Sequence, residues 1–89
     1  MYTIKISEKL HEILTKMSKK DKALYDQLLK KIEEIANSQD VDHYKNLSHD
    51  MKDSKRVHIG SFVLIFQFDK RKDELLFDNF DHHDNAYRK

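Results

Sequence analysis

The side chains best suited to chemistry in this sequence are histidines and basic residues in the middle and at the end of the chain. Arg56 and His58 are separated by one residue, while His82 and His83 are adjacent and precede Tyr87. Imidazole changes charge near neutral pH, so it can accept or donate a proton in the cell. A guanidinium group binds phosphate, and a tyrosine ring stacks on nucleobases. These residue types predict proton transfer and phosphate binding.

The same side chains also have simpler structural interpretations. Arg56 and His58 fit the solvated side of an amphipathic strand, and His82 and His83 fit a surface pair at a strand end. A ring such as Tyr87 packs a terminal segment onto a sheet as readily as it stacks on a base. The six histidines lack the ligand spacing of zinc sites, and the chain has no cysteine. We therefore predict no metal site and no disulfide.

Residues 55–68 predict a β-hairpin that positions the first two of these residues. Gly60 and Ser61 fit a two-residue turn, because glycine adopts a positive φ at no steric cost. Strand side chains alternate, so Arg56 and His58 share one face of the first arm while its apolar residues share the other. The second arm is apolar on both faces, which is typical of an interior strand covered on both sides.

Two amphipathic helices are predicted between an N-terminal strand and this hairpin. Residues 2–6 alternate between apolar and polar, which indicates a half-buried strand. Ser7 fits the N-cap of the first helix, and Ser18 or Asp21 fits that of the second. The short link between the helices predicts an antiparallel pair packed on the sheet. Each helix carries an apolar stripe at helical spacing, formed by Leu10, Ile13, Leu14 and Met17 in the first and by Leu24, Leu28, Ile32 and Ile35 in the second.

A last strand is predicted over residues 75–82, and a polar, irregular stretch with a short turn at 43–47 precedes the hairpin. Strict alternation in the last strand puts Leu76 and Phe80 on one face and Leu75 and Phe77 on the other. The resulting order β-α-α-β-β-β predicts a two-layer α+β fold, in which a helical hairpin packs on one face of a small antiparallel-rich sheet.

Composition indicates a single domain over residues 1–89. Charged residues make up 37% of the chain and the net charge is +1, which is only a weak indication of a nucleic-acid partner. A chain of this length has room for one sheet with helices on one side and no deep cofactor cavity. No apolar run approaches a membrane span and no signal peptide is visible, so a cytoplasmic protein is expected.

Three stretches of the chain resemble the RelE/ParE superfamily of toxins, and archaeal RelE-like members in particular. They are Tyr44-Lys45-Asn46-Leu47, the hairpin over 55–66 and the tail from His82 to Arg88. The resemblance implies a toxin of a type II toxin–antitoxin module, whose partners are a cognate antitoxin, the ribosome and messenger RNA. RelE-like toxins cut messenger RNA in the ribosomal A site. The 2′-hydroxyl attacks the adjacent phosphate, so the activity implied is a metal-independent endoribonuclease without a cofactor.

The resemblance also implies which residues carry that activity. Catalytic positions of the superfamily correspond to two basic residues ahead of the turn glycine, Arg56 and His58. They also correspond to three residues of the tail, His82, His83 and Tyr87. Further cations are expected to hold the RNA backbone, namely Lys45, Lys52, Lys55 and Arg88. The fold then turns its apolar side towards the helices and gathers these groups on the opposite surface.

One position departs from the superfamily pattern. Val63 stands where active members typically carry an arginine that contacts the scissile phosphate. Two alternative functions therefore stay open: a catalytically weakened RelE-fold protein that mainly binds an antitoxin, and a ParE-type toxin that inhibits gyrase.

Overall fold

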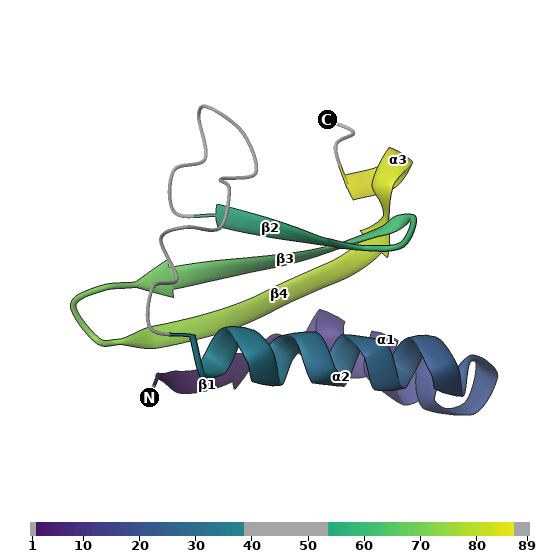
Figure 1. Cartoon of the computed structure of the whole chain (residues 1–89), viewed down its shortest axis with the longest axis horizontal. Helices are drawn as coiled ribbons and strands as arrows, with labels where there is room; N and C mark the ends of the chain where they lie inside the picture. The colour runs from purple at the N-terminus through teal and green to yellow at the C-terminus, as the bar shows by residue number, and fades with distance from the viewer. Residues whose placement is uncertain (1, 39–53, 87–89) are drawn as a thin grey trace.

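The chain folds into a layer of strands and a layer of two long helices. The computed structural model describes residues 2–38 and 54–86. Its elements are β1 (Thr3–Ile6), α1 (Glu8–Lys20), α2 (Lys22–Ala36), β2 (Ser54–Ile59), β3 (Phe62–Asp69), β4 (Glu74–His82) and the short α3 (His83–Ala86). Helices α1 and α2 run side by side along the sheet, and α3 stands at the opposite side of the view (Figure 1). The predicted α+β class and element order are confirmed, and α3 is an addition to them.

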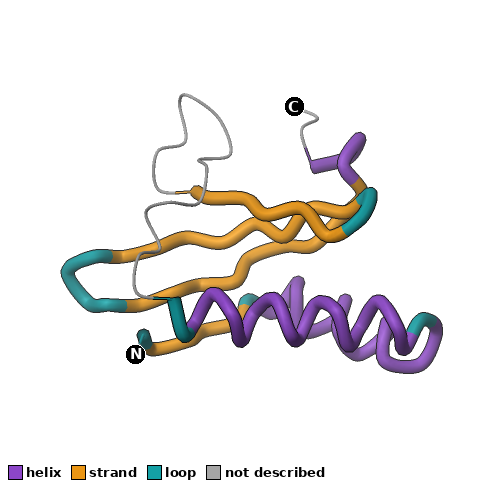
Figure 2. Tube along the Cα trace, in the orientation of Figure 1, coloured by secondary structure: helices purple, strands orange, loops and turns teal. Residues whose placement is uncertain are grey.

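The four strands form one mixed sheet in the order β1-β4-β3-β2. The pairs β2–β3 and β3–β4 are antiparallel, whereas β1 runs parallel to β4. The tube in Figure 2 follows the two reversals that link β2, β3 and β4. The first reversal is the predicted turn, where Gly60 has a φ of 60°. The predicted interior strand is β3, since it has a paired neighbour on each side.

The helical hairpin begins and turns at capping residues. The Ser7 hydroxyl accepts a hydrogen bond from the Leu10 N–H at 3.0 Å and donates one to the Asp78 carbonyl at 2.6 Å. Of the two residues considered for the second cap, the structure selects Asp21, whose carboxylate accepts from the Leu24 N–H at 3.1 Å. Both caps satisfy first-turn amides that have no partner inside the helix. None of the helices in the described segments is long and apolar enough to cross a membrane.

One apolar cluster fills the space between the helices and the sheet. Its fully buried members include Leu10 of α1, Leu28 of α2 and Phe66 of β3. The two helical stripes predicted from spacing supply the helix side, with Leu24, Ile13 and Met17 packed at its margin. Burial of this kind contributes roughly 25 cal/mol per Å² of apolar surface, so the cluster stabilises the packing of the helices on the sheet.

Strand β1 is more exposed than the alternation of its residues predicts. All four of its residues are exposed, and Ile4 and Ile6 keep 43% and 42% of their surface accessible. The prediction of a half-buried strand is therefore wrong. The reason is position: β1 is a four-residue strand at the sheet edge, held by its pairing with β4 and by a Lys5–Glu74 ion pair of 3.3 Å.

Strand β4 contains a β-bulge that changes the facing of its C-terminal half. Ile65 pairs with Asn79 while the next residue, Phe66, pairs with Phe77, so Asp78 is left over in β4. The extra residue reverses the alternation beyond it. Phe80 consequently joins Leu75 and Phe77 in the core, and the prediction that it faces away from them is wrong. The turn expected at 43–47 lies outside the described residues.

Candidate functional site

The sheet has one face towards the helices and a second face that carries polar groups. We call the second face, formed by Arg56 and His58 of β2, Val63 and Ile65 of β3, and Asn79 and Asp81 of β4, the distal face. Directly paired residues of antiparallel strands share a face. His58 pairs with Val63, and Val63 with Asp81; Arg56 pairs with Ile65, and Ile65 with Asn79. The predicted separation of Arg56 and His58 from the apolar side of their strand is therefore confirmed.

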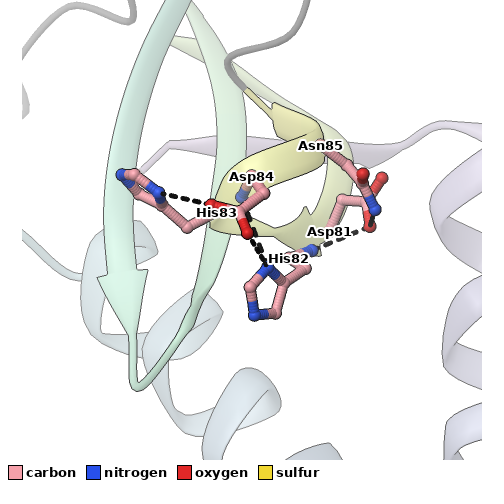
Figure 3. Close-up of polar contacts among 5 residues, drawn as sticks. All are labelled: Asp81, His82, His83, Asp84 and Asn85. Carbon is pink, nitrogen blue, oxygen red and sulfur yellow. Dashed lines mark hydrogen bonds and ion pairs between the residues drawn. The ribbon is translucent and has the colours of Figure 1, made fainter.

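His83 joins the distal face from the other end of the chain. Its ring lies 5.6 Å from the ring of His58, centroid to centroid, with the two planes 29° apart. Its backbone N–H donates a hydrogen bond of 2.8 Å to the Ser61 carbonyl in the hairpin turn. In Figure 3 the His83 ring reaches towards the neighbouring strands and the His82 ring points elsewhere. Two imidazoles that are 25 positions apart in sequence are thus brought into contact.

Short polar contacts hold α3 at this place. The Asp84 carboxylate lies between the two adjacent histidines, 3.8 Å from Nδ1 of His82 and 3.7 Å from Nδ1 of His83. The Asp84 N–H also donates to Nδ1 of His82 at 3.3 Å, and the Asn85 amide donates to the Asp81 carboxylate at 3.3 Å (Figure 3). These contacts, together with the packing of α3 on β3 and β4, position His83.

His82 does not share the surface of the other candidates. It pairs with Phe62, and its ring meets the Phe62 ring edge-on at 5.6 Å. Phe62 packs against the core cluster, so His82 is on the helix side of the sheet. The expectation that all the histidine and cationic groups gather on one surface is therefore wrong for His82. Adjacent positions at a strand end point to opposite faces, and the bulge in β4 decides which of the two faces each histidine takes.

Lys55 is likewise on the helix side. It pairs with the core residue Phe66 and retains only 7% of its surface exposed. This placement argues against the predicted contact with the RNA backbone, because a phosphate cannot reach a lysine buried in that way. The remaining predicted RNA contacts Lys45, Lys52 and Arg88, and the predicted catalytic Tyr87, lie outside the described residues.

The floor of the distal face is aliphatic. Val63 is fully buried and Ile65 is 7% exposed, yet neither belongs to the cluster under the helices.

Sequence reasoning identified the apolar run of this strand and missed the polar groups beside it, namely Asn79, Asp81 and Asp84. Asp84 directly follows the two histidines in sequence, which is the only indication that could have found it. Within the described segments, no three histidine or carboxylate residues lie close enough together to hold a metal ion.

Curated relatives resemble this chain over its whole length, although no family model matches it. A Methanocaldococcus jannaschii protein named "Putative toxin RelE4" is 51% identical over 90 residues, which cover 100% of this chain and 94% of the relative. A Methanosarcina mazei protein named only as uncharacterized is 38% identical over 88 residues, covering 98% of this chain and 100% of the relative.

Solved structures of RelE share the fold. The isolated Escherichia coli RelE toxin matches with a TM-score of 0.70 at 20% identity, covering 92% of this chain and 84% of that one. A chain of the intact E. coli RelBE toxin–antitoxin complex matches with a TM-score of 0.70 at 21% identity, covering 92% of this chain and 96% of that one. At such identities the structures establish the fold alone, while the relative at 51% establishes the family. The chain belongs to the RelE-like toxin superfamily.

Proposed function

We propose that this RelE-like toxin cuts messenger RNA on the ribosome without a metal ion and so inhibits translation. The observation that carries the proposal is the convergence of Arg56, His58 and His83 on the distal face. A guanidinium group there can bind the scissile phosphate and stabilise the charge that builds up on it. Imidazoles beside it can move the protons that transphosphorylation requires. Tyr87 follows α3 directly and is included in the proposed site, as a base-stacking or proton-transfer group.

We further propose that an antitoxin protein controls the toxin. One of the structures with this fold is a RelBE toxin–antitoxin complex, and another is an E. coli RelE mutant bound to an antitoxin peptide. The fold on which those antitoxins bind is the one described above. An antitoxin with acidic groups would complement Arg56 and the other cations proposed to bind RNA, which gives the complex specificity through charge.

The activity is tested by adding the purified protein to a translating extract and mapping the ends of the messenger RNA. We expect new 5′ ends within translated codons, and loss of about two or more orders of magnitude in cleavage rate on Arg56→Ala, because a positioned charge is removed from the phosphate. The matched control is Arg71→Ala, which removes an exposed arginine in the β3–β4 turn. Intact messenger RNA at high protein concentration, with Arg56→Ala indistinguishable from the parent, would overturn the proposal.

A second candidate function is supported by Val63. The side chain at the position of the superfamily's arginine is an apolar group that is fully buried in the distal face. A protein with a buried apolar residue at this position can keep the toxin fold and the antitoxin complex while losing RNA cleavage. Tight association with the product of the neighbouring gene, without toxicity on expression and without RNA cleavage, is the result expected of this alternative.

A further inference from the structure

The outer edge of β1 presents backbone groups for which the sheet has no further strand. β1 ends the sheet beside β4, and among the described residues no strand lies beyond it (Figure 2). The N–H groups of Thr3 and Ser7 donate hydrogen bonds of 2.9 and 3.0 Å to carbonyls on the β4 side. Backbone groups alternate between the two sides of a strand, so those of Ile4 and Ile6 point out of the edge. Such an edge is a template for a further strand.

Apolar side chains flank this edge on the helix side. Ile4 pairs with Leu75 and Ile6 with Phe77, and both partners are core residues. Paired residues of neighbouring strands share a face, so the two isoleucines face the helix layer as well. They nevertheless keep 43% and 42% of their surface exposed, because α1 packs on β4 and leaves β1 uncovered. The open backbone groups and the uncovered apolar side chains thus belong to the same two residues.

The charge that would guard this edge is balanced within the sheet. Natural edge strands commonly carry a lysine that opposes pairing with another chain. Lys5 is the charged residue of β1, and its Nζ lies 3.3 Å from the Glu74 carboxylate of β4. The edge therefore carries no net charge that would repel a strand of the same composition.

We propose that β1 pairs with β1 of a second copy of this chain, antiparallel and about a two-fold axis that passes through Ile4. The two sheets would then continue into each other, and their exposed isoleucines would cover one another. A two-fold interface uses the same surface on both copies, so it closes at a dimer. The proposal is independent of the RNA cleavage proposed above.

Backbone direction and side-chain facing restrict the register of this pairing. Hydrogen bonds can form only between residues whose backbone groups point outwards, which are Ile4, Ile6 and, by the same alternation, Tyr2. In the register centred on Ile4, that residue opposes itself and Ile6 opposes Tyr2 of the second copy. The Tyr2 ring packs edge-on against Phe68 at 5.2 Å, on the helix side. Apolar side chains therefore meet apolar side chains across the edge.

Charge selects this register over its neighbours and favours a second copy as the occupant. With Ile4 at the centre, Lys5 opposes the uncharged Thr3 of the second copy. A register centred on Lys5 would place two lysines directly opposite each other, which destabilises a pair of strands. A register centred on Ile6 would bring Ile4 against Glu8, where the chain has already entered α1. The sequence of β1 thus complements itself in one arrangement.

The dimer expected from this edge is a weak one. Pairing involves a strand of four residues. Stable complexes bury about 1,200–2,000 Å² in total, and a short edge with its flanking side chains falls at or below the lower end of that range. We therefore expect association in the micromolar range or weaker.

The test uses the purified chain and two charged variants of the central residue. Sedimentation velocity of the parent, from micromolar to near-millimolar concentration, should show an equilibrium between monomer and dimer. Ile4→Lys and Ile4→Glu each place two like charges opposite one another, so each should raise the dissociation constant about tenfold or more. An equimolar mixture of the two variants should regain the dimer, because position 4 of one copy opposes position 4 of the other.

Two controls isolate the edge and its register. Leu29→Lys changes a residue of α2 that is 38% exposed, and it should leave the dimer unchanged. A mixture of Ile6→Lys and Ile6→Glu should not regain the dimer, because Ile6 opposes Tyr2. In the parent, hydrogen exchange at the Ile4 and Ile6 amides should slow as the protein concentration rises, while exchange at the Thr3 amide should not change.

Several results would overturn the proposal. They are a parent that stays monomeric throughout, a dimer that survives the Ile4 variants or is lost equally in Leu29→Lys, failure of the Ile4 mixture or success of the Ile6 mixture, and growth beyond a dimer. Protection of the Ile4 and Ile6 amides only in a complex with the product of the neighbouring gene would assign the edge to an antitoxin instead. Circular dichroism establishes that each variant is folded, and amide exchange of the parent decides the question without any variant.

Discussion

The Ser7 hydroxyl is the residue-scale link between the two layers. It accepts the Leu10 N–H at the start of α1 and donates to the carbonyl of Asp78, the extra residue of the β4 bulge. The Ser7 N–H also donates to the Phe77 carbonyl at 3.0 Å. One residue thus fixes where α1 begins and where β4 bends, and the bend decides that His82 and His83 take the faces described above.

The change Ser7→Ala is expected to lower the free energy of unfolding by about 1–2 kcal/mol. It removes an N-cap acceptor and leaves the Asp78 carbonyl without its hydroxyl donor. Ser18→Ala is the matched control, because the Ser18 hydroxyl makes one exposed bond of 2.8 Å to the Thr15 carbonyl of its own helix. Urea denaturation of both variants measures the difference. Equal destabilisation of the Ser7→Ala and Ser18→Ala variants would contradict the stabilising role assigned to the two Ser7 hydroxyl bonds.

At the scale of elements, the β2–β3 hairpin holds both halves of the proposed site. Its first strand presents His58, and its turn accepts the His83 N–H at the Ser61 carbonyl. The turn depends on Gly60, whose φ of 60° lies in the left-handed region that L side chains avoid. The conformation of Gly60 therefore helps to position His83, because it sets the turn whose Ser61 carbonyl accepts from the His83 N–H.

We expect Gly60→Ala to destabilise the protein by about 1–2 kcal/mol through the backbone alone. A methyl group at this position meets no atom within 4 Å, so a steric clash is not part of the cost. Ser61→Ala keeps the backbone carbonyl that accepts from His83 and serves as the control. Thermal unfolding gives the stability, and the amide exchange rate of His83 reports whether α3 loosens with the turn. An unchanged midpoint for Gly60→Ala would contradict the assigned turn.

The helices and strands were largely predictable from sequence. The face of the sheet that each side chain takes at the end of β4 was not. Spacing alone identifies the helical stripes and the interior strand, because burial imposes a period of 3.6 or 2 on apolar residues. Residue type identified the Ser7 cap and left the second cap open between Ser18 and Asp21, of which the structure selects Asp21. A bulge breaks that period without a marker: Asp78 resembles any polar strand residue, and the predicted side of Phe80 was wrong in consequence. The same limit applies to Lys55, where pairing with Phe66 decides burial for a residue type that is usually exposed.

At the scale of the whole molecule, charge is nearly balanced. The chain has 17 lysines and arginines against 16 aspartates and glutamates, for a net charge of +1. Several of these charges pair with each other, as in the Lys31–Glu34 contact of 3.3 Å. A protein with little net charge attracts a polyanion weakly over long distances. Under the proposed function, long-range attraction by net charge contributes little to bringing messenger RNA to the distal face.

This balance predicts that free messenger RNA is a poor substrate. At a protein concentration that cuts ribosome-bound messenger RNA, we expect naked RNA of the same sequence to be cut about 100-fold or more slowly, since the ribosome supplies the orientation that the protein's own charge does not.

Lowering the salt concentration should enhance binding to naked RNA only slightly, and Arg56→Ala should reduce the logarithmic salt slope by about 0.7 to 1 because one phosphate contact is lost. The measurement is a filter-binding and cleavage series with and without ribosomes. A steep salt slope, or equal cleavage of free and ribosome-bound RNA, would mean that the charges on the distal face act as a general RNA-binding surface and that the ribosome is dispensable.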